Sequence, residues 1–255
     1  MYKEYTNYVS LGYFCSIAQD LEKLGLRNFS SPFDWGISSF SNVITAIDNH
    51  FDNFMNYDNL SQSVSCKKYY CDEEYKFYFF HDFSEYKTLD DQYDSVKEKY
   101  DRRIRRFLKR IESPTLFIRY ISSEEVNDFG KSIELEWIEQ NYQYIISVLK
   151  KFNSENDIIF IGDESVKSES IKVYRVVRDE NDKVSRSPIY NNDELYQYLS
   201  TVHFLGRIDN QKRWTAKEKR KHSLYTKSKN KLVKLYSKIF LTEYIHSKTY
   251  DLKDK

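Results

Sequence analysis

Two residues suited to covalent or acid–base chemistry lie at the ends of predicted elements. Cys15 follows a short buried strand over 8–12 and stands in the first turn of a helix predicted over 14–24. Unpaired N–H groups and the helix dipole at such a position favour a thiolate, so Cys15 is a candidate nucleophile. Free cysteine is also a common core residue, which leaves a purely structural role open.

His81 is the candidate general base, because histidine titrates near neutral pH. It ends an aromatic strand predicted over 75–81, which forms a hairpin with a strand over 67–71. The group that orients it is predicted to be Asp34, from an aromatic loop, or Asp163, which follows a core strand. A structural histidine at this position is the alternative.

Four further side chains are candidate substrate-binding residues: Arg119, Trp35, Asp82 and Arg103. Arg119 stands at the end of a predicted core strand, where a charge must be paired or must face a ligand cleft. Arg103 belongs to an arginine-rich stretch of a helix predicted over 91–112. This stretch either forms a solvated basic face or binds phosphate or carboxylate groups.

Alternating strands and helices must position these groups. Besides the elements already named, helical spacing of apolar residues predicts helices over 41–54, 133–152 and 195–199. Continuous apolar runs predict strands over 115–120, 157–162 and 171–177. This order favours an α/β fold, a three-layer sandwich with a mainly parallel sheet flanked by helices plus a β-hairpin. An α+β papain-like fold is the alternative.

Composition supports a folded chain with a substantial core. The sequence has 255 residues, of which 40% are hydrophobic and 17% aromatic. No apolar run is long enough to cross a membrane, and the N-terminus leads directly into a strand without a signal region. An odd count of three cysteines excludes a complete disulfide framework. We therefore expect a cytoplasmic protein.

The charge of the chain is distributed unevenly. Residues 212–255 hold 14 Lys/Arg against four Asp/Glu, a net charge of +10, so residues 1–211 carry about −9. We expect an α/β catalytic-like domain over 1–206 and a basic helical extension over 207–255. The basic tail predicts contact with an anionic membrane or a polyanion, and hence a location peripheral to the inner face of the membrane. A helix docked on its own domain is the alternative for residues 231–241.

The motifs that are missing narrow the function further. The sequence contains no phosphate-binding P-loop, no dinucleotide fingerprint and no nucleophile elbow. It also lacks the paired Cys or His spacings of zinc sites. We therefore expect no cofactor, no metal and no sequence-specific nucleic acid as a partner. The expected substrate is a small molecule, a peptide or a glycan.

Three motifs in a fixed order carry a resemblance to a known family. They are Ser10-Leu11-Gly12-x-x-Cys15, Ser31-Pro32-Phe33-Asp34-Trp35 and His81-Asp82-Phe83, supported by the stretches 102–107 and 117–119. Together they resemble a bacterial and viral family catalogued as putative papain-like cysteine peptidases. The similarity covers roughly residues 8–120 and weakens toward residue 165.

The resemblance implies that Cys15 is the nucleophile and His81 its partner. It favours a thiol-dependent hydrolase or an acyl-type transferase. Val9 stands where papains carry an oxyanion glutamine, so backbone N–H groups would stabilise the oxyanion instead. The family also resembles proteins of surface-polysaccharide synthesis, which keeps a glycan-modifying or glycosyl-transferring enzyme as an alternative. A non-catalytic membrane- or polyanion-binding module is the third hypothesis.

Overall fold

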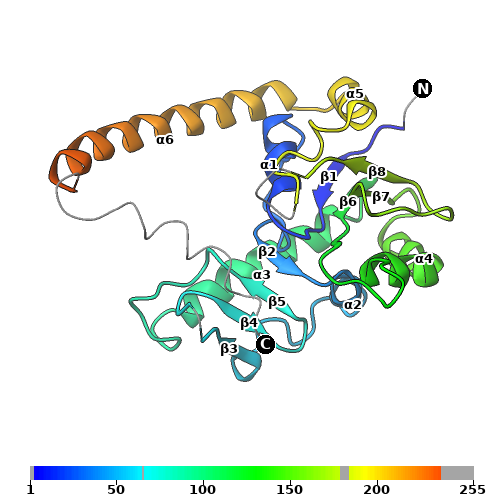
Figure 1. Cartoon of the computed structure of the whole chain (residues 1–255), viewed down its shortest axis with the longest axis horizontal. Helices are drawn as coiled ribbons and strands as arrows, with labels where there is room; N and C mark the ends of the chain where they lie inside the picture. Colours follow the sequence, from blue (N-terminus) through cyan, green and yellow to red (C-terminus); the bar gives the residue numbers. More distant parts are fainter. Residues whose placement is uncertain (1–2, 65, 179–183, 237–255) are drawn as a thin grey trace.

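A parallel and an antiparallel sheet, each with four strands, organise the chain (Figure 1). The computed structural model describes residues 3–64, 66–178 and 184–236. The parallel sheet has the order β1-β6-β7-β8 and comprises β1 (Asn7–Ser10), β6 (Thr115–Tyr120), β7 (Asp157–Asp163) and β8 (Val173–Val176). Helices cover both of its faces, which confirms the predicted α/β class.

The two faces of the parallel sheet carry separate apolar cores. Leu116 and Ile118 of β6 pack on one face with side chains of α1 (Ser16–Lys23) and α5 (Asp193–Thr201). Phe117 points to the opposite face, where α2 (Phe40–Asp48) and α4 (Ile133–Phe152) pack. Because successive strand residues point to opposite faces, a strand buried on both sides is mainly apolar.

The antiparallel sheet lies beside this sandwich and has the order β2-β5-β4-β3. Its strands are β2 (Gly36–Ser38), β3 (Leu60–Gln62), β4 (Tyr70–Asp72) and β5 (Phe77–Phe79). The hairpin predicted between 67 and 81 is present as β4 and β5. The predicted aromatic loop that carries Asp34 is present, and it leads directly into the short strand β2, which pairs with β5.

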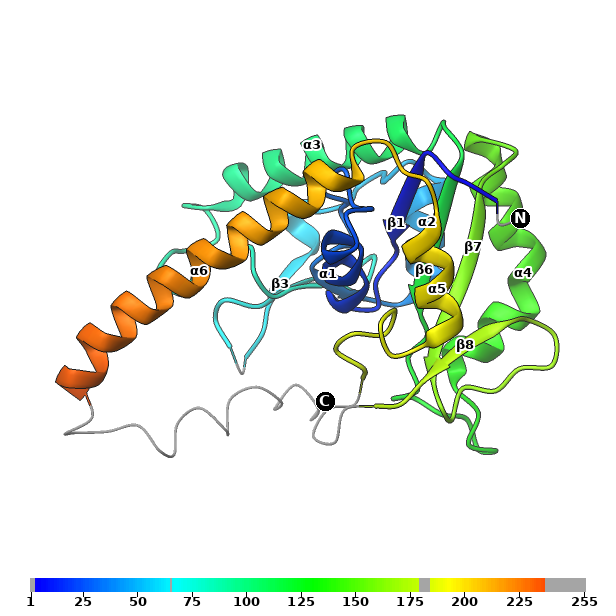
Figure 2. The same ribbon diagram turned by 90° about the horizontal axis from the view of Figure 1, so that it is seen from above.

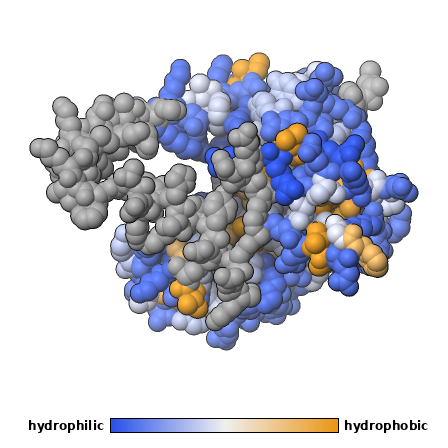
Figure 3. All heavy atoms as spheres, in the orientation of Figure 1, coloured by the Kyte–Doolittle hydropathy of each residue, from blue (hydrophilic) through white to orange (hydrophobic). Residues whose placement is uncertain are grey.

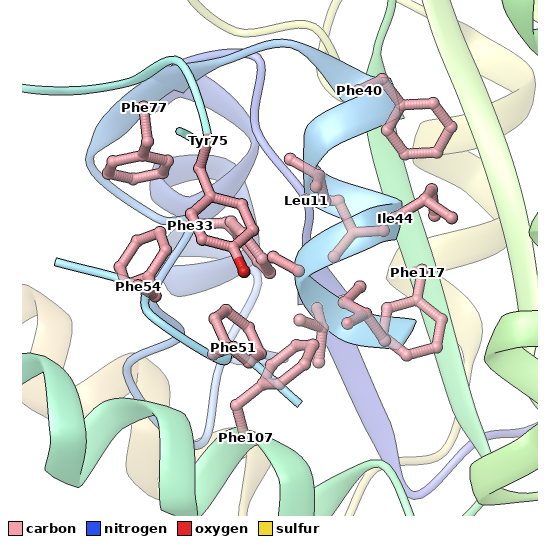
Figure 4. Packing of buried hydrophobic residues seen from close by; sticks show 14 of the residues in the cluster. Leu11, Phe33, Phe40, Ile44, Phe51, Phe54, Tyr75, Phe77, Phe107 and Phe117 are labelled. Carbon is pink, nitrogen blue, oxygen red and sulfur yellow. The ribbon is translucent and has the colours of Figure 1, made fainter. Parts of the chain in front are cut away.

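An aromatic core joins the antiparallel sheet to α3 (Tyr93–Arg110). Figure 4 shows the rings of Phe33, Phe51, Phe54 and Phe77 close together, with Phe107 reaching them from α3. Most of these pairs meet edge to face or tilted, the geometries that aromatic rings prefer. This core holds the segment around residues 31–38 against the rest of the fold.

The helix predicted over 41–54 is shorter than expected. It ends at Asp48, and the following residues His50, Phe51, Asn53 and Met55 have positive φ angles. The apolar side chains of Phe51 and Phe54 still reach the core, but from turns. The spacing of Phe51 and Phe54 continues the helical pattern and therefore predicted a longer helix. Their packing in the aromatic core stabilises the turns instead.

A long helix, α6 (Arg207–Tyr236), follows α5 and extends away from the sheets (Figures 1 and 2). The apolar segment at 231–241 runs past its end, and residues 237–241 lie outside the described residues. Within the described ranges, no helix combines the length and the apolar character that a bilayer crossing requires.

Candidate functional site

Cys15 lies at the carboxyl edge of the parallel sheet. β1 ends at Ser10, and Cys15 is the N-cap residue of α1, the helix that starts beside it. The carboxyl ends of parallel strands meet at one edge, which is where open α/β sheets bind ligands. The fold therefore places the candidate nucleophile at the edge where chemistry usually occurs in this architecture.

The thiol of Cys15 is half-buried and accepts a hydrogen bond from a neighbouring side chain. Gln19, one turn along α1, donates a hydrogen bond from Nε2 to Sγ over 3.4 Å. Burial raises the pKa of the Cys15 thiol above its ordinary value. The thiol is therefore protonated at neutral pH, and a reaction at Sγ requires a base to remove its proton.

Asp163 ends β7 at the same edge, where its carboxylate is hydrogen-bonded to neighbouring residues. Its side chain accepts hydrogen bonds from the hydroxyl of Ser123 and from the backbone N–H and hydroxyl of Ser165. Arg178 Nε lies 3.5 Å from Oδ2. Although burial alone would raise the pKa of Asp163, these donors hold it below its usual value of 3.8. Asp163 is thus an ionised carboxylate that orders the loops after β6 and β7.

Arg119, on β6, is completely buried and joins the two sheets. Nε and Nη2 bind the two carboxylate oxygens of Glu134 over 2.8 and 2.9 Å. Nη1 donates to Leu11 O and Ser38 Oγ, and Nη2 donates also to Ser38 O. Since these contacts use all five N–H donors of the guanidinium, no donor of Arg119 remains for a substrate.

Asp34 pairs with Arg27 rather than with a histidine. Oδ2 of Asp34 accepts hydrogen bonds from Arg27 Nη2 over 2.6 Å, from Arg27 Nε over 3.0 Å and from the Ser31 N–H over 2.9 Å. Burial raises the pKa of Asp34, and the Arg27 guanidinium opposes that effect. This contact fixes the turn that leads into β2.

The pairing of β2 with β5 brings Trp35 and His81 together. Their rings meet at 86° with centroids 6.5 Å apart, and the Arg27 guanidinium lies 5.7 Å from the Trp35 ring. Asp82 turns the other way, toward α3: its carboxylate accepts from Lys99 and from the Tyr100 hydroxyl over 2.8 Å. Arg103 Nη1 is 3.8 Å from the same carboxylate.

The predicted site residues thus fall into two groups. Cys15, Asp163 and Arg119 belong to the parallel sheet, whereas Asp34, Trp35, His81, Asp82 and Arg103 surround β2, β5 and α3. Within the part of the chain that the structure describes, no hydrogen bond joins Cys15 to His81. In the same part, no group of three or more His, Cys, Asp or Glu side chains could hold a metal ion.

Three residues with clear roles in these groups, Gln19, Glu134 and Arg27, were not predicted from the sequence. Gln19 was detectable from its position four residues after Cys15, one helical turn away. Glu134 and Arg27 are the ion-pair partners of Arg119 and Asp34. A buried strand arginine requires a carboxylate, but spacing alone could not select Glu134 among the many acidic residues.

The sequence is similar to a known protein family and to a viral protein. Residues 6–145 match the family described as "putative papain-like cysteine peptidase". The chain is also 30% identical over 189 residues to the uncharacterized protein R408 of Acanthamoeba polyphaga mimivirus, covering 64% of this chain and 80% of that protein. No protein of solved structure matches the chain. The family match includes Cys15 and His81, whereas Asp163 lies beyond it.

Proposed function

The chain belongs to the family of putative papain-like cysteine peptidases, and on that premise we propose that it is a thiol-dependent hydrolase or acyl transferase. Cys15 is the nucleophile of this proposal. The observation that supports it is the position of Cys15, half-buried at the carboxyl edge of the parallel sheet and at the start of α1. A strand-turn-helix connection is a common setting for a covalent nucleophile.

The proposed reaction begins with loss of the thiol proton to a base. Sγ then attacks the carbonyl carbon of an acyl donor, a carbon–sulfur bond forms, and the carbonyl oxygen becomes an oxyanion. Collapse of this intermediate expels the leaving group, which takes up the proton from the base. Water or an acceptor hydroxyl or amine then attacks the thioester and regenerates the Cys15 thiol.

His81 is the proposed base, as the family resemblance implies. Its exposed ring packs on Trp35, and among the described residues no hydrogen bond joins it to Cys15. The proposal therefore requires the two side chains to come together when substrate binds. Hydrogen bonds at catalytic sites often form only in the substrate complex. Trp35, half-buried beside His81, is a proposed substrate contact in the same complex.

Gln19 is the side chain best placed to stabilise the oxyanion. Its Nε2 amide already donates toward Sγ. An oxyanion forms next to the attacking sulfur, and a donor positioned there in advance lowers the energy of the transition state. Backbone N–H groups in the first turn of α1 are the second source of donors.

Alkylation of the cysteines by iodoacetamide tests the role of Cys15. The full chain is labelled over a range of pH and each cysteine is followed by peptide mass spectrometry. Cys71 is a matched internal control, because burial raises its pKa to about 12. Faster labelling of Cys15 than of Cys71 under native conditions would support an accessible nucleophile, and a Cys15 that reacts only after unfolding would overturn the proposal.

An activated acyl ester tests the chemistry itself. We expect a transient acyl adduct on Cys15 in the native chain, absent from Cys15→Ser, with slower formation in His81→Gln. Equal rates of adduct formation in His81→Gln and the native chain would remove His81 as the base without affecting the role of Cys15. Acyl turnover that persists in Cys15→Ser would rule out thiol catalysis.

A further inference from the structure

Among its described side chains, α6 contacts the body through residues of its first three turns. Asn210 and Gln211 donate hydrogen bonds to the carbonyl oxygens of Gly25 and Leu24 over 3.0 and 3.3 Å. Lys217 pairs with Glu22 over 2.8 Å. All three contacts lie at the carboxyl end of α1, and beyond them the helix extends past the body (Figure 2).

The exposed surface of this side of α6 and of its neighbouring faces is rich in positive charge. Residues 207–221 include seven basic and two acidic side chains, a net charge of +5. Lys217 and Lys221 form ion pairs. The remaining exposed cations of this stretch are Lys212, Arg213, Lys219 and Arg220. Among the described residues, none of these four side chains forms an ion pair or a hydrogen bond.

Two exposed apolar side chains lie at the base of this charged side. Leu205 is 91% exposed and Ile208 is 67% exposed. Lys212 and Lys219 stand four and eleven residues after Ile208, on the same stripe of the helix. Figure 3 shows that the visible surface is otherwise mainly hydrophilic, with only scattered apolar side chains. An apolar pair next to unpaired lysines is therefore a distinct surface feature.

We propose that this basic face, comprising Leu205, Ile208, Lys212, Arg213, Lys219 and Arg220, binds the surface of an anionic phospholipid bilayer. Anionic headgroups attract basic side chains near the surface, and apolar side chains beside them insert into the interface. Residues 1–211 carry about −9 and would be repelled by the same surface. Charge complementarity thus assigns the contact to α6 and not to the body.

The apolar pair Leu205 and Ile208 favours a lipid surface over a nucleic acid as the partner of this face. A polyanion would use the four cations but would gain nothing from Leu205 and Ile208, which have no role in phosphate binding. α6 is held at the carboxyl end of α1, whereas Cys15 lies at the start of that helix.

Co-sedimentation with vesicles tests the proposal on the full chain. Vesicles of phosphatidylcholine alone are compared with vesicles that also contain phosphatidylserine, at low and high ionic strength. We expect binding only to the anionic vesicles, and we expect it to weaken as salt increases. The variant K212E/R213E/K219E/R220E should lose binding by about tenfold or more.

A matched charge reversal on another helix provides the control. R102E/R105E/R106E/R110E changes the net charge by the same amount on the exposed side of α3. If the α3 variant loses binding as strongly as the α6 variant, the effect is one of net charge and the proposal fails. Circular dichroism of both variants checks that the fold is intact.

The variant L205S/I208S separates lipid from polyanion. Binding to anionic vesicles should weaken several-fold, whereas binding to heparin should be unchanged. If vesicle binding is insensitive to this change, or if heparin binds more tightly than the vesicles, α6 is a polyanion site and the lipid proposal is overturned. Self-association of the chain at low salt, seen by light scattering without vesicles, would assign the face to a second copy instead.

Discussion

Arg119 of β6 and Glu134 of α4 form a buried, bidentate ion pair between the parallel sheet and the first turn of a helix on its face. The same guanidinium binds Ser38 of β2 and the carbonyl of Leu11 just after β1. One side chain therefore fixes the relative positions of the two sheets and of the segment that leads to Cys15. Because the Arg119–Glu134 ion pair is buried, we expect the stability of the fold to depend on both of its charges.

Removing one partner of this pair should destabilise the fold strongly. In Arg119→Met, Glu134 is left as an uncompensated buried charge, and we expect the free energy of unfolding to fall by about 3 to 5 kcal/mol. Urea denaturation measures the loss. The double variant R119M/E134L should recover part of it, since neither charge then remains buried. An Arg119→Met protein of native stability would return this residue to the substrate-binding role predicted from the sequence.

Asp163 should stabilise the protein in a pH-dependent way. Its native pKa is below 3.8, so its stabilising contribution is fully present above that value and disappears as pH falls through the native pKa. Asp163→Asn should therefore cost about 2 kcal/mol near neutral pH, and the difference from the native chain should shrink in acid. Thermal unfolding across pH gives this comparison. A cost that does not depend on pH would mean that packing, and not charge, is the cause.

Gly36 should tolerate no side chain. A Cβ atom at this position would lie 2.2 Å from Cζ of Phe77, whose ring is buried in the aromatic core. We expect Gly36→Ala to destabilise the fold by about 1 to 3 kcal/mol through overpacking. The double variant G36A/F77L should be more stable than G36A alone. If the double variant loses as much stability as G36A and F77L lose separately in sum, the predicted clash between residue 36 and Phe77 is wrong.

Gln19 should tune the titration of Cys15. Because its amide donates to sulfur, it favours the thiolate, and Gln19→Leu should raise the pKa of Cys15 further. The pH at which alkylation of Cys15 becomes fast should therefore be higher in Gln19→Leu than in the native chain. Cys71 labelling in the same samples should not change. An unshifted Cys15 profile would show that the contact has no electrostatic effect.

Much of the fold could be predicted from periodicity. The buried strands β6 and β7 are continuous apolar runs, and the helix Ile133–Phe152 has the predicted bounds. Predictions from the local sequence pattern were wrong where tertiary contacts determine the backbone conformation. The helix over 41–54 stops at Asp48 because Phe51 and Phe54 pack into the aromatic core from turns with positive φ. The strand Gly36–Ser38 is too short to show alternation, and only its pairing with β5 defines it.

The candidate site shows the same division. The sequence by itself determined that Cys15 follows a strand and begins a helix, because both elements are local and apolar spacing encodes them. It could not determine that Arg119 forms an ion pair with Glu134. It also could not determine that Asp34 binds Arg27, or that His81 packs on Trp35. Those partners come from elements far apart in the chain. Which of these residues meet depends on how the two sheets pack against each other. Residue type and local spacing do not specify contacts between segments that are so far apart in the chain.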